Sequence, residues 1–296
     1  MGGKAIMKIK VYMMNSFAET AEGGNLAGVV FDADNLSEED MKSIAGKLGF
    51  SETAFVMSSD KADFRLRFFT PTEEVDLCGH ATIGTFYTMS KLHLLEKGNY
   101  KQETNQGILG VEICDHNFIM MEQFVPELSE IIDKKEIAES LNIDVSQIPS
   151  ALPVQIVSTG LRDILVPVKS IEILNNMQPD MDKITEISRK YNVIGYHVFA
   201  LEVPNGANAY CRNFAPLYNI TEEAATGTSN GALAGYLYHY GKVTKKQAAH
   251  LVFKQGYSMQ KPSEIRASLE ILGDEIKRVK VGGSAQNLRL VEIEYC

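Results

Sequence analysis

The stretch ADFRLRFFTPTEEVDLCGHATIGT, from Ala62 to Thr85, joins a strand pattern directly to a helix pattern. Its first part alternates apolar and charged residues, which predicts a half-buried β-strand. Small residues from Gly79 onward then open a mostly apolar run, which predicts a helix buried against a sheet. The alternating residues of the strand are Phe64, Arg65, Leu66, Arg67 and Phe68.

The same succession returns in the second half of the chain. Strand-like runs lead to a second small-residue turn, ATGTSNGALAGYL, which starts at Ala225. Cys78 and Thr226 hold matching places in the two turns, and their separation, 226 minus 78, is 148 residues, half of the 296 in the chain. A chance match of two glycine-containing turns is the alternative. The repeat predicts two similar α/β domains that face each other across a cleft, with one helix N-terminus from each half directed into it.

Two further patterns predict a helix start in the first half and the boundary between the domains. Ser37 and Asp40 form a capping-box-like start to a helix whose apolar residues follow at helical spacing. An acidic stretch from Val125 to Pro153 interrupts the strand pattern, and we interpret it as a crossing between domains that carries a solvated helix. We therefore expect an N-terminal domain over residues 1–125 and a C-terminal domain over 126–281, with a last strand at about 282–296 that can rejoin the first domain.

Composition narrows the possible functions. The chain is 45% hydrophobic and 23% charged, no run is long enough to span a membrane and no export signal is evident, so we expect a cytoplasmic protein without a membrane partner. A formal net charge of −9 argues against a nucleic-acid partner. The four cysteines lie far apart and the histidines lack metal-ligand spacing, which predicts reduced thiols and no metal. Because no nucleotide-binding G-x-G-x-x-G occurs, the sequence does not support nucleotide binding.

Three side chains near the turns are candidates for chemistry. Glu52 starts a strand among apolar residues, where an enclosed carboxylate can serve as a general acid and base; a solvent-exposed strand end is the alternative. His80 can hydrogen-bond a substrate, or it can cap and pack the helix. Cys78 can be a thiolate nucleophile at a helix N-terminus or an inert buried thiol.

The two helix N-termini suggest an anion site. Unpaired N–H groups there suit a substrate carboxylate, with ordinary capping by Thr226 and Thr228 as the alternative.

Six motifs together resemble the PhzF family of phenazine-biosynthesis-like isomerases. They are GGNLAGVV, SETAF, ADFRLRFFTPTEEVDLCGHATIGT, PVQIVSTGLRDILVPV, RNFAP and ATGTSNGALAGYL, and the resemblance runs from about Ile9 to the C-terminus. The resemblance implies the diaminopimelate epimerase fold, in which each of two pseudo-symmetric α/β domains wraps a sheet around a central helix and the site lies in the cleft between them. It also implies a homodimer.

The resemblance further implies roles for individual residues. Glu52 would remove a proton from carbon and return it elsewhere on the substrate, while His80 and Glu223 would hold and polarise the substrate. Asn25, in the GGN turn, would close the site or serve the turn alone. The substrate-binding residues implied in this way are Asn25, Cys78, Gly79, Gly227, Thr228 and Ser229.

This chain departs from its apparent relatives at two places. Epimerases and racemases of this fold use a cysteine from each half, but the counterpart of Cys78 is Thr226, which argues against a two-cysteine racemase. The second-half motif E-D-P-A-T-G-S-A reads EEAATGTS here, from Glu222 to Ser229. Glu223 thus stands in place of the aspartate and moves its charge by about one methylene, which matters for positioning a substrate.

The resemblance and the site candidates lead to one main expectation and two alternatives. We expect a cofactor-independent isomerase that moves a proton between carbons of a small carboxylate, such as an amino acid or a cyclic dienyl acid. One alternative is a non-catalytic carboxylate-binding relative. The other is a hydrolase in which Cys78 attacks a carbonyl with His80 as base, although two side chains so close at a helix start would not naturally face each other.

Overall fold

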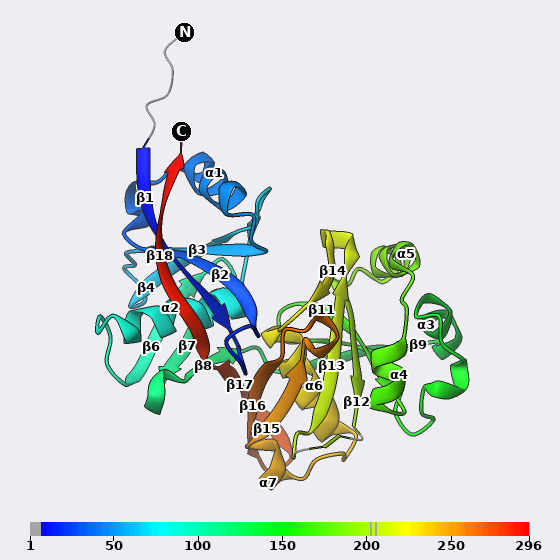
Figure 1. Cartoon of the computed structure of the whole chain (residues 1–296). Coiled ribbons are helices and arrows are strands. Elements are labelled where there is room, and N and C mark those ends of the chain that lie inside the picture. Colours follow the sequence, from blue (N-terminus) through cyan, green and yellow to red (C-terminus); the bar gives the residue numbers. More distant parts are fainter. Residues whose placement is uncertain (1–6, 202, 205, 296) are drawn as a thin grey trace. The chain divides into compact units, whose positions relative to one another are not determined.

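The computed structural model describes residues 7–201, 203–204 and 206–295, and the chain divides into two compact units. Unit 1 comprises Met1–Glu122 and Gly282–Cys296, and unit 2 comprises Gln123–Val281. The chain therefore leaves unit 1 once and returns to it for its last strand. Figure 1 colours the first and last strands of unit 1 blue and red.

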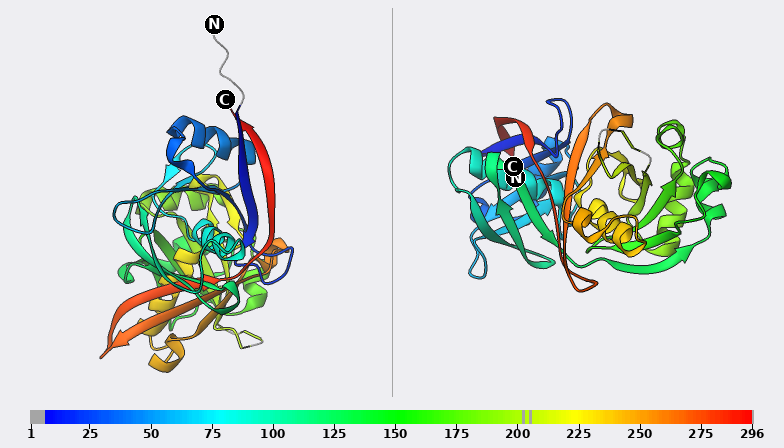
Figure 2. Two further views of the ribbon diagram at one scale, coloured as in Figure 1. Left: turned by 90° about the vertical axis from the view of Figure 1, so that its left-hand side faces the viewer. Right: turned by 90° about the horizontal axis from the view of Figure 1, so that it is seen from below.

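Unit 1 is a mixed sheet with two helices, α1 (Glu38–Leu48) and α2 (Gly79–Lys91). Its strands are β1 (Met7–Ser16), β2 (Asn25–Val30), β3 (Glu52–Met57), β4 (Phe64–Phe69), β5 (Glu74–Val75), β6 (Gly98–Thr104), β7 (Gly107–Ile113), β8 (Ile119–Gln123) and β18 (Ala285–Tyr295). The order is β18-β1-β2-β3-β4-β6-β7-β8, and the short β5 pairs with β4. Figure 2 shows β1 and β18 side by side, in agreement with their antiparallel register.

Unit 2 combines a similar sheet with more helices. Its strands are β9 (Glu127–Ile132), β10 (Val154–Ser158), β11 (Arg162–Val168), β12 (Gly195–Ala200), β13 (Ala209–Ala215), β14 (Ile220–Glu223), β15 (Leu251–Gln255), β16 (Ser263–Leu272) and β17 (Glu275–Gly283). Its helices are α3 (Lys134–Ser140), α4 (Ile171–Asn176), α5 (Met181–Tyr191), α6 (Gly227–His239) and α7 (Lys245–Ala248). No helix in the described part of the chain is long and apolar enough to cross a membrane.

The two sheets have the same topology. The series β18-β1-β2-β3-β4-β6-β7 in unit 1 matches β9-β10-β11-β12-β13-β15-β16 in unit 2. The parallel pairs fall at equivalent places, β2–β3 with β11–β12 and β4–β6 with β13–β15. The repeat predicted from the two small-residue turns is therefore present throughout the sheet.

The central helix of each unit is buried on all sides. In α2 every residue from Gly79 to Ser90 is buried, and in α6 every residue from Gly227 to Leu237 is buried. Such a helix has no solvent-exposed polar face, so its side-chain hydroxyl groups need hydrogen-bond acceptors within the same helix. Thr82, Thr85 and Thr88 each donate to the carbonyl four residues earlier, at 2.7–2.8 Å.

Glycines in the central helices let other segments pack against the helix backbone. A Cβ added at Gly84 would lie 2.7 Å from Sδ of Met14 on β1, and one at Gly231 would collide with the side-chain amide of Gln123. A larger residue at either place would push the packed segment away. Close packing around α2 and α6 therefore accounts for the small residues that the sequence concentrates there.

The acidic stretch from Val125 to Pro153 contains more structure than its sequence indicated. Residues Glu127–Ile132 form β9, which pairs antiparallel with β10, so a strand of the sheet was missed. The predicted helix is present as α3, with Lys135 and Glu139 exposed, but it is solvated on one side only, because Ile137 and Ala138 lie in the hydrophobic core of unit 2. The many acidic residues of this stretch made its few core-facing apolar positions hard to recognise in the sequence.

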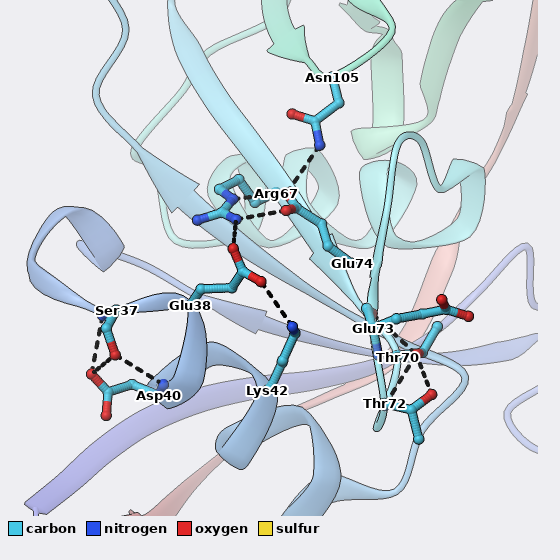
Figure 3. A network of polar contacts seen from close by, with 10 residues as sticks. All are labelled: Ser37, Glu38, Asp40, Lys42, Arg67, Thr70, Thr72, Glu73, Glu74 and Asn105. Atoms are coloured by element: carbon cyan, nitrogen blue, oxygen red, sulfur yellow. Dashed lines mark hydrogen bonds and ion pairs between the residues drawn. The ribbon is translucent and has the colours of Figure 1, made fainter.

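A bidentate ion pair fixes the segment that leads from β4 into α2 (Figure 3). Nε and Nη2 of Arg67 donate to Glu74 at 2.7 and 2.6 Å, and the guanidinium lies 5.0 Å from the centroid of the Phe69 ring. Glu38 of α1 accepts from Nη2 at 3.3 Å, and Asn105 donates to Glu74 at 3.1 Å. The hydrogen bonds from Arg67 are the chief reason that the pKa of Glu74 lies below its ordinary value.

Unit 2 repeats this ion pair at the matching place. Nε and Nη2 of Arg212 donate to Glu222 at 2.9 and 2.8 Å, and the guanidinium lies 4.9 Å from the centroid of the Phe214 ring. Nη1 of Arg212 donates to the carbonyls of Leu174 and Met177, where α4 ends, at 2.9 and 3.2 Å. The internal repeat thus extends from the strand order to individual side chains.

Removing the partner of Arg212 should cost more stability than a similar change at the surface. Glu222→Gln leaves a guanidinium whose side chain is only 10% exposed without its counter-ion. We expect the free energy of unfolding to fall by about 2–3 kcal/mol. Glu38→Gln, at an exposed position, is the control and should cost clearly less. Urea unfolding measures both changes, and equal losses would contradict the importance of the buried pair.

Candidate active site

Glu52, Cys78 and His80 come together in unit 1 where β3 and α2 begin. Nε2 of His80 lies 3.3 Å from Oε2 of Glu52, and Sγ of Cys78 lies 3.4 Å from Nδ1 and 3.9 Å from Nε2 of the same ring. Nδ2 of Asn25 lies 3.3 Å from Nδ1, and Oγ of Ser51 lies 3.4 Å from Nε2. The site residues predicted in the first half of the chain are thus gathered around one imidazole.

Backbone geometry explains why Cys78 contacts His80. Cys78 is the N-cap of α2 and has extended angles, φ −138° and ψ 116°, so helical side-chain spacing does not apply to it. The expectation that these two side chains would not face each other was therefore wrong. Asn25 likewise begins β2 instead of lying in the preceding turn, where Gly24 has a φ of +82°.

Burial keeps the His80 imidazole neutral. Its side chain is 4% exposed, and burial lowers its pKa although the neighbouring Glu52 carboxylate acts in the opposite direction. Oε2 of Glu52 is also buried and accepts no hydrogen bond from the described residues, because Nε2 of His80 is at ion-pair distance without hydrogen-bond alignment. A carboxylate oxygen in this setting can accept a proton from a bound molecule.

In unit 2 the predicted residues surround the first turn of α6. Thr226 is the N-cap, but its hydroxyl makes no capping bond and instead donates to Oε2 of Glu223 at 2.5 Å. Nε2 of Gln255 donates to the Glu223 carbonyl at 2.8 Å and to the Thr226 hydroxyl oxygen at 3.1 Å. The carbonyl of Thr228 accepts from Thr159 at 2.9 Å. Ordinary capping by the Thr226 hydroxyl is therefore excluded, and Glu223 is held against the turn that begins at Gly227.

Four buried polar side chains that the sequence did not single out as a group also meet at this turn. Ser229 donates to Oδ2 of Asp163 at 2.5 Å and accepts from Nδ2 of Asn213 at 3.1 Å, and Asn213 lies 3.3 Å from Nδ1 of His197. Burial raises the pKa of Asp163 to about 7, although hydrogen bonds from Ser229 and the Gly195 N–H oppose it, and burial lowers the pKa of His197 to about 3. The Ser229 side chain, predicted to bind substrate, is thus engaged with Asp163.

Aligning the two units through the repeat shows which site residues occur in only one of them. The motif R-x-F-x-P, at 67–71 and 212–216, aligns β4 with β13, and the strand registers extend the alignment across both sheets. On this alignment Glu52 corresponds to Gly195, so unit 2 has no counterpart of the carboxylate. Asp163, His197, Asn213 and Ser229 correspond to Ala27, Ala54, Phe68 and Ala81, which are all fully buried.

Sequence comparison identifies relatives over nearly the whole chain. The model of the PhzC-PhzF family, phenazine biosynthesis-like proteins, matches residues 14–289. The chain is 35% identical over 291 residues to an uncharacterized isomerase of Clostridium acetobutylicum. The matched region covers 95% of this chain and 96% of that protein. It is 29% identical over 281 residues to the trans-2,3-dihydro-3-hydroxyanthranilate isomerase of Pseudomonas chlororaphis, with 92% and 94% covered.

Structure comparison agrees with the sequence matches. The PhzF-family phenazine biosynthesis protein of Bacillus anthracis superimposes with a TM-score of 0.86 at 31% identity, over 97% of this chain and 99% of that one. A hydroxyproline epimerase of Agrobacterium vitis shares the fold, with a TM-score of 0.66 at 12% identity over 97% and 92% of the two chains. The fold class expected from the sequence, α/β of the diaminopimelate epimerase type, is confirmed.

Asp163 should make the stability of the protein depend on pH. Its pKa is about 7 in the folded state and near 3.8 when unfolded, so between these values the folded state binds the extra proton. Stability therefore falls as pH rises from about 4 through 7, and the loss is complete above that range. We expect Asp163→Asn to raise the melting temperature at pH 8 by more than it does at pH 5.

Thermal unfolding at the two pH values measures this effect. Asp274→Asn, the same charge change at an exposed position of unit 2, is the control and should shift the melting temperature little at either pH. A gain for Asp163→Asn that is larger at pH 5 would contradict the burial of an ionised carboxylate.

Proposed function

The chain belongs to the PhzC-PhzF family of phenazine biosynthesis-like proteins and is an isomerase, and on that premise we propose that it moves a proton between carbons of a small carboxylate-bearing substrate. Glu52 is the proposed acid and base, and the proposed reaction uses no cofactor. The observation that carries the proposal is the buried Oε2 of Glu52, which accepts no hydrogen bond from the described residues and lies 3.3 Å from a neutral imidazole.

A single carboxylate is sufficient for this isomerisation. Glu52 removes a proton from a carbon atom of the substrate, and the electron pair left behind spreads over the adjacent conjugated or carboxylate-bearing system. The proton held by Glu52 exchanges with solvent water, and Glu52 then returns a proton to another carbon of that system, so that no other reactant is consumed. Gly195 at the equivalent place in unit 2 is consistent with one acid and base, since it offers no second carboxylate there.

His80 is the proposed partner of the developing negative charge. A neutral imidazole still carries one N–H group, which can donate a hydrogen bond to the substrate where negative charge develops. Burial favours this neutral form. Asn25 and Cys78 contact Nδ1 and hold the orientation of the ring. The ring can therefore stay fixed while the proton moves on and off Glu52.

The first turn of α6 is the proposed place for the polar groups of the substrate. The first N–H groups of an α-helix lack partners within the helix, and their partial positive charge attracts a carboxylate. Glu223, held by the Thr226 hydroxyl and directly preceding this turn in the chain, would accept from an amino or hydroxyl group. The Pseudomonas relative is named for a substrate with such groups, trans-2,3-dihydro-3-hydroxyanthranilate, which makes that compound and its analogues the first candidates to test.

A cysteine mechanism is the second candidate, because Sγ of Cys78 lies 3.4 Å from Nδ1 of His80. In that mechanism His80 takes the thiol proton and the thiolate attacks a carbonyl. Cys78→Ala distinguishes the two mechanisms. It abolishes turnover if the thiolate is the nucleophile, whereas proton exchange at carbon continues if Glu52 is the base.

The proposed reaction predicts entry of deuterium at carbon. Purified protein in D₂O is incubated with trans-2,3-dihydro-3-hydroxyanthranilate and a panel of small amino and hydroxy carboxylates, and exchange is followed by proton NMR. We expect exchange with one class of substrate and a loss of at least about 100-fold for Glu52→Gln, which removes the proton carrier but keeps the shape of the side chain.

Glu270→Gln, at an exposed position of β16, is the control and should leave exchange unchanged. Full exchange by Glu52→Gln would reject Glu52 as the acid and base. Tight ligand binding without exchange would favour a non-catalytic relative.

A further inference from the structure

We propose that Glu52, Cys78 and His80 form a binding site for a zinc ion, and that zinc bound there blocks the isomerase. The metal site rests on this side-chain cluster alone. Only the blocking effect rests on the function proposed above.

The three side chains offer the ligand types that zinc prefers. One ligand atom from each lies within 4.8 Å of the other two, and the residues come from the start of β3 and the start of α2. Thiolate, imidazole and carboxylate are all common zinc ligands, whereas a thiolate disfavours magnesium and calcium. The donor set therefore selects zinc or a similar transition metal.

Two of the three distances between ligand atoms approach those of a tetrahedral site, and the third, from Cys78 to Glu52, lies within 4.8 Å. With metal–ligand bonds of about 2.0–2.3 Å, neighbouring ligands of a tetrahedron lie about 3.3–3.6 Å apart. Nε2 of His80 is 3.3 Å from Oε2 of Glu52 and 3.9 Å from Sγ of Cys78. Rotation about the single side-chain bond of Cys78 can close the longer distance, because this residue is an N-cap outside the helical backbone. A water molecule or an oxygen of a ligand would complete the four positions.

Charge also favours the site. On binding, the Cys78 thiol gives its proton to solvent and its sulfur forms a bond to zinc. Zinc then carries two positive charges against one thiolate and one carboxylate, while the His80 imidazole is neutral, so the complex has no net charge. A neutral complex can lie among side chains that are only 4–14% exposed, where an unbalanced ion could not.

A neighbouring side chain supports the same arrangement. The side-chain amide of Asn25, 3.3 Å from Nδ1, can accept the second ring proton through its oxygen when the amide is turned, which leaves Nε2 for the metal. The ring is thus held in the orientation that directs Nε2 toward Glu52.

Bound zinc and proton transfer exclude each other. Oε2 of Glu52 is the proposed proton acceptor, and the same lone pair would form the bond to zinc. A carboxylate bound in this way is a much weaker base, so turnover stops until the metal leaves. A chelator should therefore restore activity fully.

Cobalt(II) is the direct probe of the metal site, because a cobalt–thiolate bond gives a charge-transfer absorption in the near ultraviolet. Protein stripped with EDTA and dialysed is titrated with cobalt. We expect this absorption to saturate at one equivalent and to disappear when zinc is added. Cys78→Ser should lose the absorption, and His80→Asn should weaken cobalt binding at least about tenfold.

Cys114→Ser, which removes a different and more accessible thiol of unit 1, is the control and should bind cobalt like the wild type. Far-ultraviolet circular dichroism checks that each variant is folded. Absence of a thiolate absorption in the wild type, or its persistence in folded Cys78→Ser, would overturn the metal site.

Deuterium exchange separates this inference from the proposed function. With a substrate in hand, one equivalent of zinc should abolish exchange and EDTA should restore it. Cobalt binding without exchange on any substrate would retain the metal site and reject the isomerase mechanism. Exchange that continues at saturating zinc would reject the blocking effect.

Discussion

Enclosure of a helix on every side is the constraint on which both units depend. The strands can wrap α2 and α6 only if these helices expose no polar face, so small residues line them and threonine hydroxyls in α2 bond to the helix's own carbonyls. Hydrogen-bond donors without helical partners then remain only at the helix N-termini. The predicted site residues cluster around these ends, because that is where an enclosed helix can still offer N–H groups to a ligand.

The repeat separates what the fold needs from what the site needs. The Arg67–Glu74 and Arg212–Glu222 pairs occur in both units with nearly the same geometry, as expected for contacts that hold the segment before a central helix. Glu52 occurs in one unit only, and its counterpart is Gly195. Two domains with the same topology can thus differ at single positions, such as the start of β3 and of β12, while the ion pairs that fix the approach to each central helix stay the same.

Much of this arrangement could be predicted from the sequence, because its signals are local. The Ser37–Asp40 capping box and the alternation around Leu66 gave the correct helix and strand, and the two turns gave the repeat. Edge strand β9 was missed because only Ile132 of its residues is buried, which leaves almost no alternation to detect. The contact between Cys78 and His80 was missed because it depends on the extended backbone of an N-cap.

The buried polar cluster of unit 2 was beyond sequence reasoning for a different reason. Asp163 and Ser229 are 66 residues apart, and each alone is unremarkable in its element. The fold itself does not require the cluster, since unit 1 builds the equivalent contacts from Ala27, Ala54 and Ala81. Burying a carboxyl group costs stability, and unit 1 folds with apolar residues at the matching places, so the needs of the sheet alone do not explain the cluster. Its member Ser229 lies in the first turn of α6 and joins that turn to Asp163 and Asn213 through hydrogen bonds.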